Sequence, residues 1–362
     1  MRSPLAALLL SILISAAATA DPQLVKDIRL DGTQSSLPRN FVSDGTTAYF
    51  IADDQNPSAL WKTDGTPEGT QLLKMTMPPH FESFAYSAPW LTVSGDTVYF
   101  FGATELGDII TLFRTDGTPE GTVPLADIGD RFNNQVESVA AVGGGRIAFV
   151  VTQSGPDQVW VSDGTPAGTR RLPAPMDASG LLSDGTMAWF TSGASLERAL
   201  WQTDGRQAGT RSVITIGPST LLGGIVAGKP FLGTRVGSSG SDLFILDGAA
   251  LTKIGHVDEG SLSESQSMNG AGGLLFVLST VTTHALWTTD GTADGTKLLA
   301  SLPGQIIAGG TVRGISFFAT LPQSGARQLW RTDGTPAGTF VLTEDANLIR
   351  PVGSGSRHQY FL

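Results

Sequence analysis

The chain has 362 residues, no cysteine and a formal net charge of −10 at pH 7. Without cysteine it can form neither a disulfide nor a thiolate nucleophile. Its basic residues are scattered along an acidic chain, which argues against a nucleic-acid or anionic-membrane surface.

Residues 1–20 are typical of a secretory signal peptide. Arg2 precedes an apolar run of about a dozen residues, and the small residues Ala18, Thr19 and Ala20 form a cleavage site. The apolar run is too short for a comfortable membrane span, so we expect no transmembrane segment. We therefore predict cleavage after Ala20, a secreted or periplasmic protein, and one mature domain over residues 21–362.

One phrase recurs along the mature chain, of which "LWRTDGTPAGT" at residues 329–339 is a clear copy. Each phrase contains an Asp-Gly pair, and the last four pairs, at Asp204, Asp247, Asp290 and Asp333, are spaced 43 residues apart. A fixed period of this kind is the signature of a repeat architecture. Each copy has an aromatic residue three positions before its Asp-Gly pair. The aromatic residue, the Asp and the Gly of the seven copies are Trp61, Asp64 and Gly65; Phe113, Asp116 and Gly117; Trp160, Asp163 and Gly164; Trp201, Asp204 and Gly205; Phe244, Asp247 and Gly248; Trp287, Asp290 and Gly291; and Trp330, Asp333 and Gly334.

The repeat over residues 91–127 shows what one unit builds. Apolar, β-branched and aromatic runs at 91–93, 97–103, 110–115 and 122–127 alternate with Gly, Asp and Pro at 94–96 and 116–121. This alternation is typical of strands joined by tight turns. Each repeat is therefore expected to form a four-stranded antiparallel sheet.

We interpret the motif itself as structural. Asp-Gly is the strongest short-range turn signal, since Gly accepts a positive φ and Asp accepts hydrogen bonds from nearby amides. A large aromatic residue at one site of every repeat suits packing between neighbouring sheets. We expect the second glycine of each loop to have its own special dihedral angle, at Gly69, Gly121, Gly168, Gly209, Gly295 and Gly338.

The two ends of the mature chain look like parts of one further repeat. Residues 23–28, "QLVKDI", match the strand that ends a repeat, and Tyr360-Phe361 match the aromatic mark of a second strand. Such a permuted order removes free sheet edges by closing a ring. The sequence predicts an all-β fold, a single β-propeller of eight blades closed by the N-terminal strand, with seven blades as the alternative.

The repeated phrase resembles the bacterial ELWxxDGT repeat family, exported proteins that are expected to form β-propellers. The match covers nearly the whole mature chain, although other residues replace the leading Glu and the fifth copy has lost its Thr-Pro-x-Gly-Thr tail. The resemblance implies no established enzymatic activity. The hairpin also looks like the Asp-box of sialidases, but the sialidase catalytic arginines and tyrosine have no counterparts here.

Two features suggest binding on the face opposite the Asp-Gly hairpins, where the variable loops lie. Residues 77–90 form an inter-blade loop whose side chains could stack on a sugar or grip a peptide; the alternative is a longer strand with core aromatics. Acidic and amide groups in other loops could hold calcium, although solvated charge accounts for them as well, and we expect no cofactor or metal. The first set is His80, Phe81, Phe84, Tyr86 and Trp90; the second is Asp53, Asp54, Asn56, Glu105, Asp108, Asp157, Glu197 and Asp242.

Catalytic motifs are mostly absent from the sequence. There is no HExxH, GxSxG, P-loop or dinucleotide fingerprint, and the four histidines lie in unrelated repeats. The leading hypothesis is an exported, non-catalytic, monomeric scaffold that binds a protein or glycan through its variable-loop face. The alternatives are a carbohydrate-active enzyme with carboxylates at the central channel and a structural part of the cell envelope.

Overall fold

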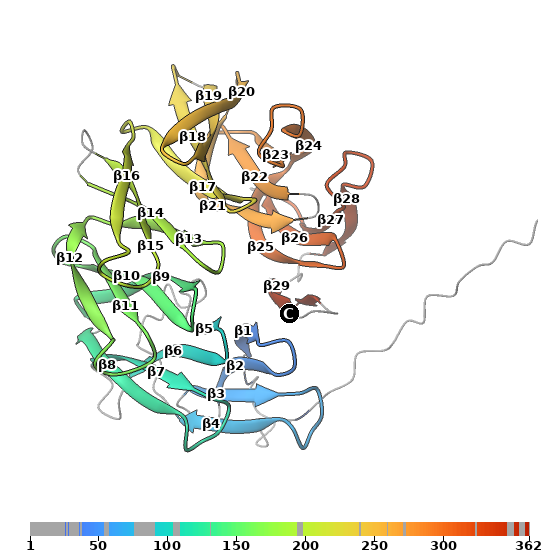
Figure 1. Ribbon diagram of the computed structural model, residues 1–362. Coiled ribbons are helices and arrows are strands. Elements are labelled where there is room, and N and C mark those ends of the chain that lie inside the picture. The colour runs from blue at the N-terminus through green and yellow to red at the C-terminus, as the bar shows by residue number, and fades with distance from the viewer. Residues whose placement is uncertain are drawn as a thin grey trace, which may run out of the picture.

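The computed structural model describes residues 26, 28, 36, 38–53, 58–75, 91–103, 109–130, 132–193, 198–238, 240–258, 260–270, 273–322, 324–345, 351–354 and 359–361. These residues form only β-structure: seven four-stranded antiparallel sheets and one two-stranded sheet (Figure 1). The predicted all-β class and the four-stranded repeat unit are confirmed. No helix in these ranges is long and apolar enough to cross a membrane.

Each four-stranded sheet is one blade, numbered here in chain order. Blade 1 contains β1 (Arg39–Ser43), β2 (Ala48–Asp53), β3 (Ser58–Thr63) and β4 (Gln71–Met75); blade 2, β5 (Leu91–Ser94), β6 (Thr97–Ala103), β7 (Ile109–Thr115) and β8 (Val123–Asp130); blade 3, β9 (Asn134–Val142), β10 (Arg146–Gln153), β11 (Gln158–Ser162) and β12 (Arg170–Met176); blade 4, β13 (Ser179–Ser183), β14 (Ala188–Ser192), β15 (Ala199–Thr203) and β16 (Arg211–Thr215).

The remaining strands continue the same pattern. Blade 5 contains β17 (Thr220–Val226), β18 (Lys229–Val236), β19 (Gly240–Asp247) and β20 (Ala250–Val257); blade 6, β21 (Ser261–Gly270), β22 (Gly273–Ser279), β23 (His284–Thr289) and β24 (Lys297–Leu302); blade 7, β25 (Gly304–Val312), β26 (Ile315–Pro322), β27 (Arg327–Thr332) and β28 (Phe340–Asp345); and the terminal sheet, β29 (Pro351–Ser354) and β30 (Gln359–Phe361).

The first strands of the blades form the hub of a propeller. Within every blade the four strands pair in chain order. Each first strand contacts the first strand of the next blade, from β1 to β5 and on to β25. The strand β29 contacts both β25 and β1, so the terminal sheet stands between blade 7 and blade 1 (Figure 1).

Hydrogen bonds of a shared sheet do not close this ring in the part of the chain that the structure describes. The terminal sheet contains only β29 and β30. Of residues 23–28, which were expected to supply a closing strand, only Lys26 and Ile28 are described, and neither belongs to a strand. The structure therefore shows seven four-stranded blades and one incomplete sheet.

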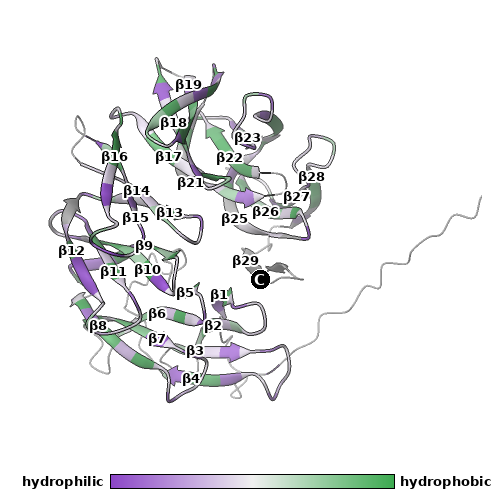
Figure 2. Cartoon of the chain, viewed as in Figure 1, coloured by the Kyte–Doolittle hydropathy of each residue, from purple (hydrophilic) through white to green (hydrophobic). Residues whose placement is uncertain are grey.

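Apolar side chains fill the spaces between blades. The second strands β6 and β22 are buried along most of their length, whereas the outer strand β16 is largely exposed, and Figure 2 shows the same change from apolar to polar along the blades. In most blades a phenylalanine of the second strand lies beside the motif aromatic of the third. These pairs are Phe50 and Trp61, Phe100 and Phe113, Phe149 and Trp160, Phe190 and Trp201, Phe276 and Trp287, and Phe318 and Trp330.

The aromatic pairs pack against the preceding blade. Phe190 and Trp201 of blade 4 lie in one cluster with Val142 and Val150 of blade 3. The rings are stacked in the pairs of blades 2, 3, 4 and 7, with centroids 5.0 Å apart for Phe100 and Phe113. Buried aromatic pairs contribute about 0.5–1.5 kcal/mol beyond their area. One recurring sequence position thus provides the packing between successive sheets.

Candidate functional site

The Asp-Gly hairpins connect the third and fourth strands and share one construction. In blade 2, the Asp116 carboxylate accepts hydrogen bonds from the Thr118 amide (2.9 Å) and the Thr118 hydroxyl (2.7 Å). The Thr118 hydroxyl in turn accepts from the Gly121 amide at 2.9 Å. The same three bonds occur around Asp64, Asp163, Asp290 and Asp333.

The two glycines of each hairpin serve different purposes. Gly117 has φ 87°, and its equivalents in the other blades also have positive φ, as the turn chemistry predicts. Gly121 and its equivalents do not. A Cβ at Gly121 would overlap the Asp116 carboxylate, and the same overlap exists at the other copies that retain this glycine. The expectation of a special dihedral angle there was wrong: the second glycine makes room for the aspartate.

Hydrogen bonding also fixes the charge of the motif aspartates. The hydroxyl and then the amide of the following threonine lower the pKa of Asp64, Asp116, Asp290 and Asp333. At Asp163 the Thr165 hydroxyl has the same effect on the pKa. In blade 4, Arg206 replaces the threonine; its amide donates to Asp204 at 3.0 Å, and its guanidinium forms an exposed ion pair with the same carboxylate at 3.5 Å. The motif carboxylates thus stabilise their own loops.

The hairpins of blades 2, 3, 4 and 6 lie against the blade before them. A Cβ on Gly117 would lie 2.8 Å from the Tyr49 hydroxyl oxygen of blade 1, and Lys62 of that blade donates to the Gly117 carbonyl at 2.7 Å. A Cβ on Gly164 would likewise lie 2.9 Å from the Tyr99 hydroxyl oxygen of blade 2. The Tyr99 hydroxyl donates to the Gly145 carbonyl of blade 3 at 2.6 Å, and burial raises the pKa of Tyr99 to about 12.

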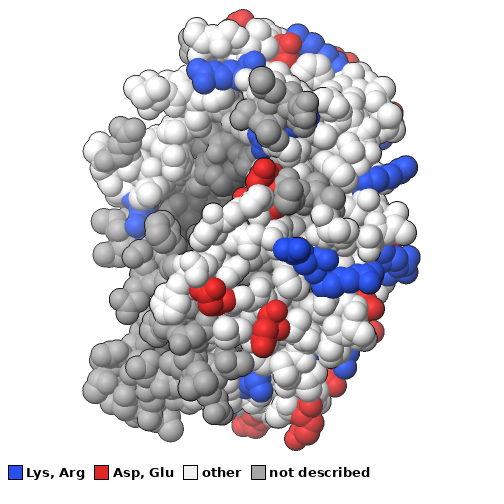
Figure 3. Space-filling model, turned by 90° about the vertical axis from the view of Figure 1, so that its left-hand side faces the viewer, with Lys and Arg blue, Asp and Glu red and all other residues white. Residues whose placement is uncertain are grey.

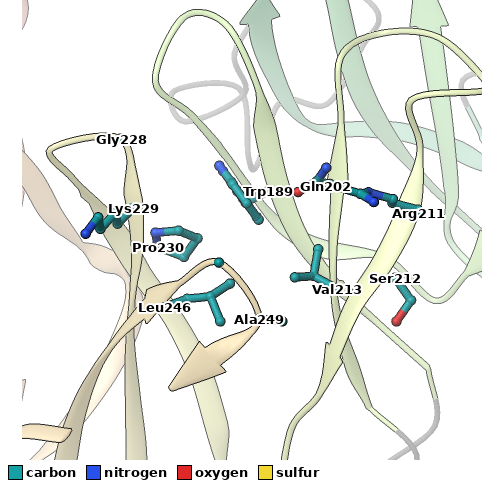
Figure 4. A pocket seen from close by; sticks show the side chains of 11 residues that line it. Trp189, Gln202, Arg211, Ser212, Val213, Gly228, Lys229, Pro230, Leu246 and Ala249 are labelled. Atoms are coloured by element: carbon teal, nitrogen blue, oxygen red, sulfur yellow. The ribbon is translucent and has the colours of Figure 1, made fainter. Parts of the chain in front are cut away.

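The seam between blades 4 and 5 is different and contains a pocket of about 480 Å³. Only Gly248 and Ala249 separate β19 from β20, because the fifth copy of the motif lacks its tail. Figure 4 shows side chains of the two blades facing each other across the space, with Trp189 of β14 opposite Pro230 of β18. The lining residues are Trp189, Gln202, Arg211, Ser212, Val213, Gly228, Lys229, Pro230, Leu246, Gly248 and Ala249.

None of the sequence-based binding candidates is among the described residues that line this pocket. His80, Phe81, Phe84, Tyr86 and Trp90 all lie outside the described residues. The pocket residues were missed because they come from two repeats and meet only in the folded ring. One signal could have found them, namely the worn fifth motif copy, whose short hairpin leaves the seam open.

The suggested calcium ligands are described only in part. Asp157 and Asp242 lie on different blades, and among the described residues no three acidic or histidine side chains form a metal-binding group. Asp242 lies within β19 rather than in a loop, and Lys253 (2.7 Å) and His256 (2.6 Å) already bind its carboxylate. The description does not extend to Asp54, Asn56, Glu105, Asp108 and Glu197, nor to the side chain of Asp53.

Charge is mixed on the side of the molecule shown in Figure 3. Lys and Arg lie among Asp and Glu there, and a short row of basic side chains crosses the right half of that view. The pocket lining itself contains Arg211 and Lys229 but no acidic residue.

Solved structures of the same fold include parts of several peptidases. The β-propeller domain of the Trilobed protease from Pyrococcus furiosus, whose topology is described as an open velcro, is 13% identical with a TM-score of 0.51, covering 87% of this chain and 98% of that domain. One of two prolyl endopeptidases is 13% identical with a TM-score of 0.55, covering 84% of this chain and 49% of its own. Dipeptidyl peptidase 4 of Porphyromonas gingivalis is 10% identical with a TM-score of 0.54; the match covers 87% of this chain and 55% of the peptidase.

The chain therefore spans about half the length of the latter two peptidases. No family model and no curated protein matches it. At identities of 10–13% the likeness establishes the β-propeller fold alone.

These neighbours correct the function expected from the sequence. A free-standing scaffold for a protein or glycan was expected, with a carbohydrate-active enzyme as the alternative, whereas the propellers that this chain resembles belong to a protease and to peptidases. Sequence motifs could not indicate this, because the likeness lies in the arrangement of the sheets.

Proposed function

We propose that this chain is the propeller of a peptide-hydrolysing assembly. The observation that carries the proposal is its match to nearly the whole propeller domain of the Pyrococcus protease, 98% of that domain and 87% of this chain. In this proposal the hydrolytic groups belong to a hydrolase that the propeller contacts. The propeller limits which peptides reach that hydrolase.

A ring of rigid sheets suits such a role. Its hub consists of the first strands of successive blades, held in place by buried aromatic pairs. A wall of this kind can exclude bulky or folded substrates and admit flexible peptides, because packed interiors yield little to strain. The work on the prolyl endopeptidases assigns inter-domain dynamics a role in catalysis and specificity in those enzymes. We extend such a role in specificity to this chain as part of the proposal.

Immunodepletion tests the association. The chain is removed with a specific antibody from an extract of the cells that produce it, and hydrolysis of short and long fluorogenic peptides is measured before and after. We expect most of the hydrolysis to leave with the chain, and the activity to elute with it in gel filtration above the size of a monomer. Unchanged hydrolysis after depletion, or turnover by the purified chain alone, would contradict the proposal.

Export belongs to the same proposal. The apolar run before Ala20 and the resemblance to exported ELWxxDGT repeat proteins support removal of residues 1–20. Protein isolated for the depletion experiment should then begin at Asp21 when its N-terminus is sequenced. A sequence beginning at or near Met1 would remove this part of the proposal.

We further propose that the terminal sheet and residues 23–28 together make an eighth blade. The aromatic pair of blade 1, Phe50 and Trp61, lies on the side away from blade 2, and Ile28 packs against it. Lys26 donates to the Thr70 carbonyl in the hairpin of blade 1 at 2.7 Å. Lys62 of blade 1 likewise donates to the hairpin of blade 2, although to Gly117 at the start of that loop rather than to its last residue. Lys26 thus reaches the hairpin of blade 1 as a residue of a preceding blade would.

A further inference from the structure

The pocket between blades 4 and 5 lies where a hairpin would stand in a regular repeat. The regular loops occupy residues such as 64–70 and 116–122, whereas the fifth has only residues 248–249 between its strands. In regular seams the first hairpin glycine lies against the preceding blade, as Gly117 and Gly164 do. No described atom outside its own neighbours lies within 4 Å of a Cβ placed on Gly248.

Trp189 of blade 4 holds the position that Tyr49 holds in blade 1 and Tyr99 in blade 2. In those blades the tyrosine lies against the hairpin of the following blade. Trp189 is paired with Gln202 across β14 and β15, just as Tyr49 is paired with Lys62 in blade 1. The Trp189 indole Nε1 atom is buried and has no hydrogen-bond partner among the described residues, and the same holds for Trp61, Trp160 and Trp287. Trp189 therefore lines the pocket with its ring and not with its N–H group.

Arg211 gives the pocket a positive charge. Its Nε and Nη2 atoms donate to the Gln202 side-chain oxygen at 3.0 and 3.1 Å, in the amide orientation that these donors require. No carboxylate lies within ion-pairing distance of Arg211 in the described ranges, although the chain carries a net charge of −10. Lys229, also in the lining, pairs with Asp247 at 2.9 Å, but both side chains are exposed and such pairs are weak.

The opposite wall of the pocket is apolar. Val213 of β16 is half-buried, and Pro230 and Leu246 of blade 5 are buried. Figure 4 shows these three side chains around the space, with Arg211 and Gln202 to one side. A volume of about 480 Å³ lies within the range of small-ligand sites.

We propose that this pocket binds the C-terminal end of a short peptide whose last residue is apolar. The terminal carboxylate accepts hydrogen bonds from Arg211, and the last side chain packs on Val213, Pro230 and Leu246. The need for a carboxylate beside an apolar group follows from the lining alone. The choice of a peptide as its source rests on the proposed function.

Calorimetric titration of the purified mature chain tests this proposal. The probes are N-acetyl-alanyl-leucine and the same dipeptide with its C-terminus amidated. We expect the free acid to bind. The amide should bind at least about tenfold more weakly, since it loses a charge-assisted hydrogen bond. Arg211→Gln should weaken binding of the acid by a similar factor.

Two further variants separate binding from folding. Arg170→Gln changes the equivalent first residue of the fourth strand in blade 3, which does not line the pocket, and should leave binding unchanged. Ala249→Trp fills the pocket from the exposed short hairpin and should abolish binding without lowering Tm.

Several results would overturn the proposal. The proposal is wrong if the free acid does not bind at concentrations up to about 1 mM, or if acid and amide bind with equal affinity. It is also wrong if Arg211→Gln binds the acid as tightly as the unmodified chain does. If 3-phenylpropanoate binds as tightly as the dipeptide, the peptide is wrong as the ligand. Because no hydrolase is present in the titration, a negative depletion experiment would remove the proposed function without deciding this binding result.

Discussion

In five of the seven blades a threonine follows the Asp-Gly pair and lowers the pKa of the aspartate. Its hydroxyl and amide hydrogen bonds lower the pKa of Asp116 below the ordinary value of 3.8 in blade 2 and act likewise in four other blades. A carboxyl whose pKa is lowered in the folded state contributes stability above its unfolded pKa and loses it as the pH falls through the folded pKa. The chain should therefore keep a constant Tm from pH 7 to about pH 5 and lose stability steeply below about pH 4.

Thr118→Val tests this assignment at one hairpin. The variant keeps the β-branched shape but removes the hydroxyl, so it should lower stability at pH 7 by about 1 kcal/mol, a typical hydrogen bond. The loss should shrink as the pH falls towards 3, because protonation of Asp116 removes the charged acceptor of this hydrogen bond. Thr282→Val is the control, since the Thr282 hydroxyl has no partner in the described part of the chain. Urea melts at both pH values measure the difference, and a loss independent of pH would speak against the assignment.

At the scale of elements, the hairpin ties each blade to the one before it. Gly117 and Gly65 have nearly the same backbone, with φ 87° and 91°. A Cβ at Gly117 would meet Tyr49 at 2.8 Å, whereas no described atom lies within 4 Å of a Cβ at Gly65. The two positions therefore separate backbone strain from contact between blades.

Gly65→Val should cost about 1–3 kcal/mol from its positive φ alone. Gly117→Val should cost about 1–3 kcal/mol more, because the side chain collides with Tyr49 of blade 1. Urea unfolding midpoints of the two variants measure the gap. Equal losses would mean that the hairpin of blade 2 does not support the seam.

The elements themselves could be predicted from local sequence. The strands expected at 97–103 and 110–115 appear as β6 (Thr97–Ala103) and β7 (Ile109–Thr115). They could be predicted because a strand is determined by the side-chain pattern of its own few residues and by the turn residues at its ends. The role of Gly121 was missed, since it depends on where the Asp116 carboxylate folds back. The pocket was missed because Trp189 and Ala249 belong to separate repeats, and only the stacking of blades brings them together.

At the scale of the whole molecule, the proposed eighth blade accounts for the contacts that β29 and residues 26 and 28 make. The aromatic pair of blade 1 is covered by Ile28, and β29 links blade 7 to blade 1. Without residues 23–28, Phe50 and Trp61 would lose a half-buried neighbour, Ile28, and Thr70 would lose the Lys26 bond. An unclosed ring would also expose a sheet edge of the terminal sheet to solvent and to other chains.

Thermal unfolding of two truncated chains measures this most directly. One begins at Gln23 and serves as the control, and the other begins at Arg29 and so lacks residues 23–28. If these residues complete an eighth blade, the shorter chain should melt at least ~5 °C lower, from the loss of buried area and of the Lys26 bond. Coincident melting curves would contradict a propeller closed by its N-terminal segment.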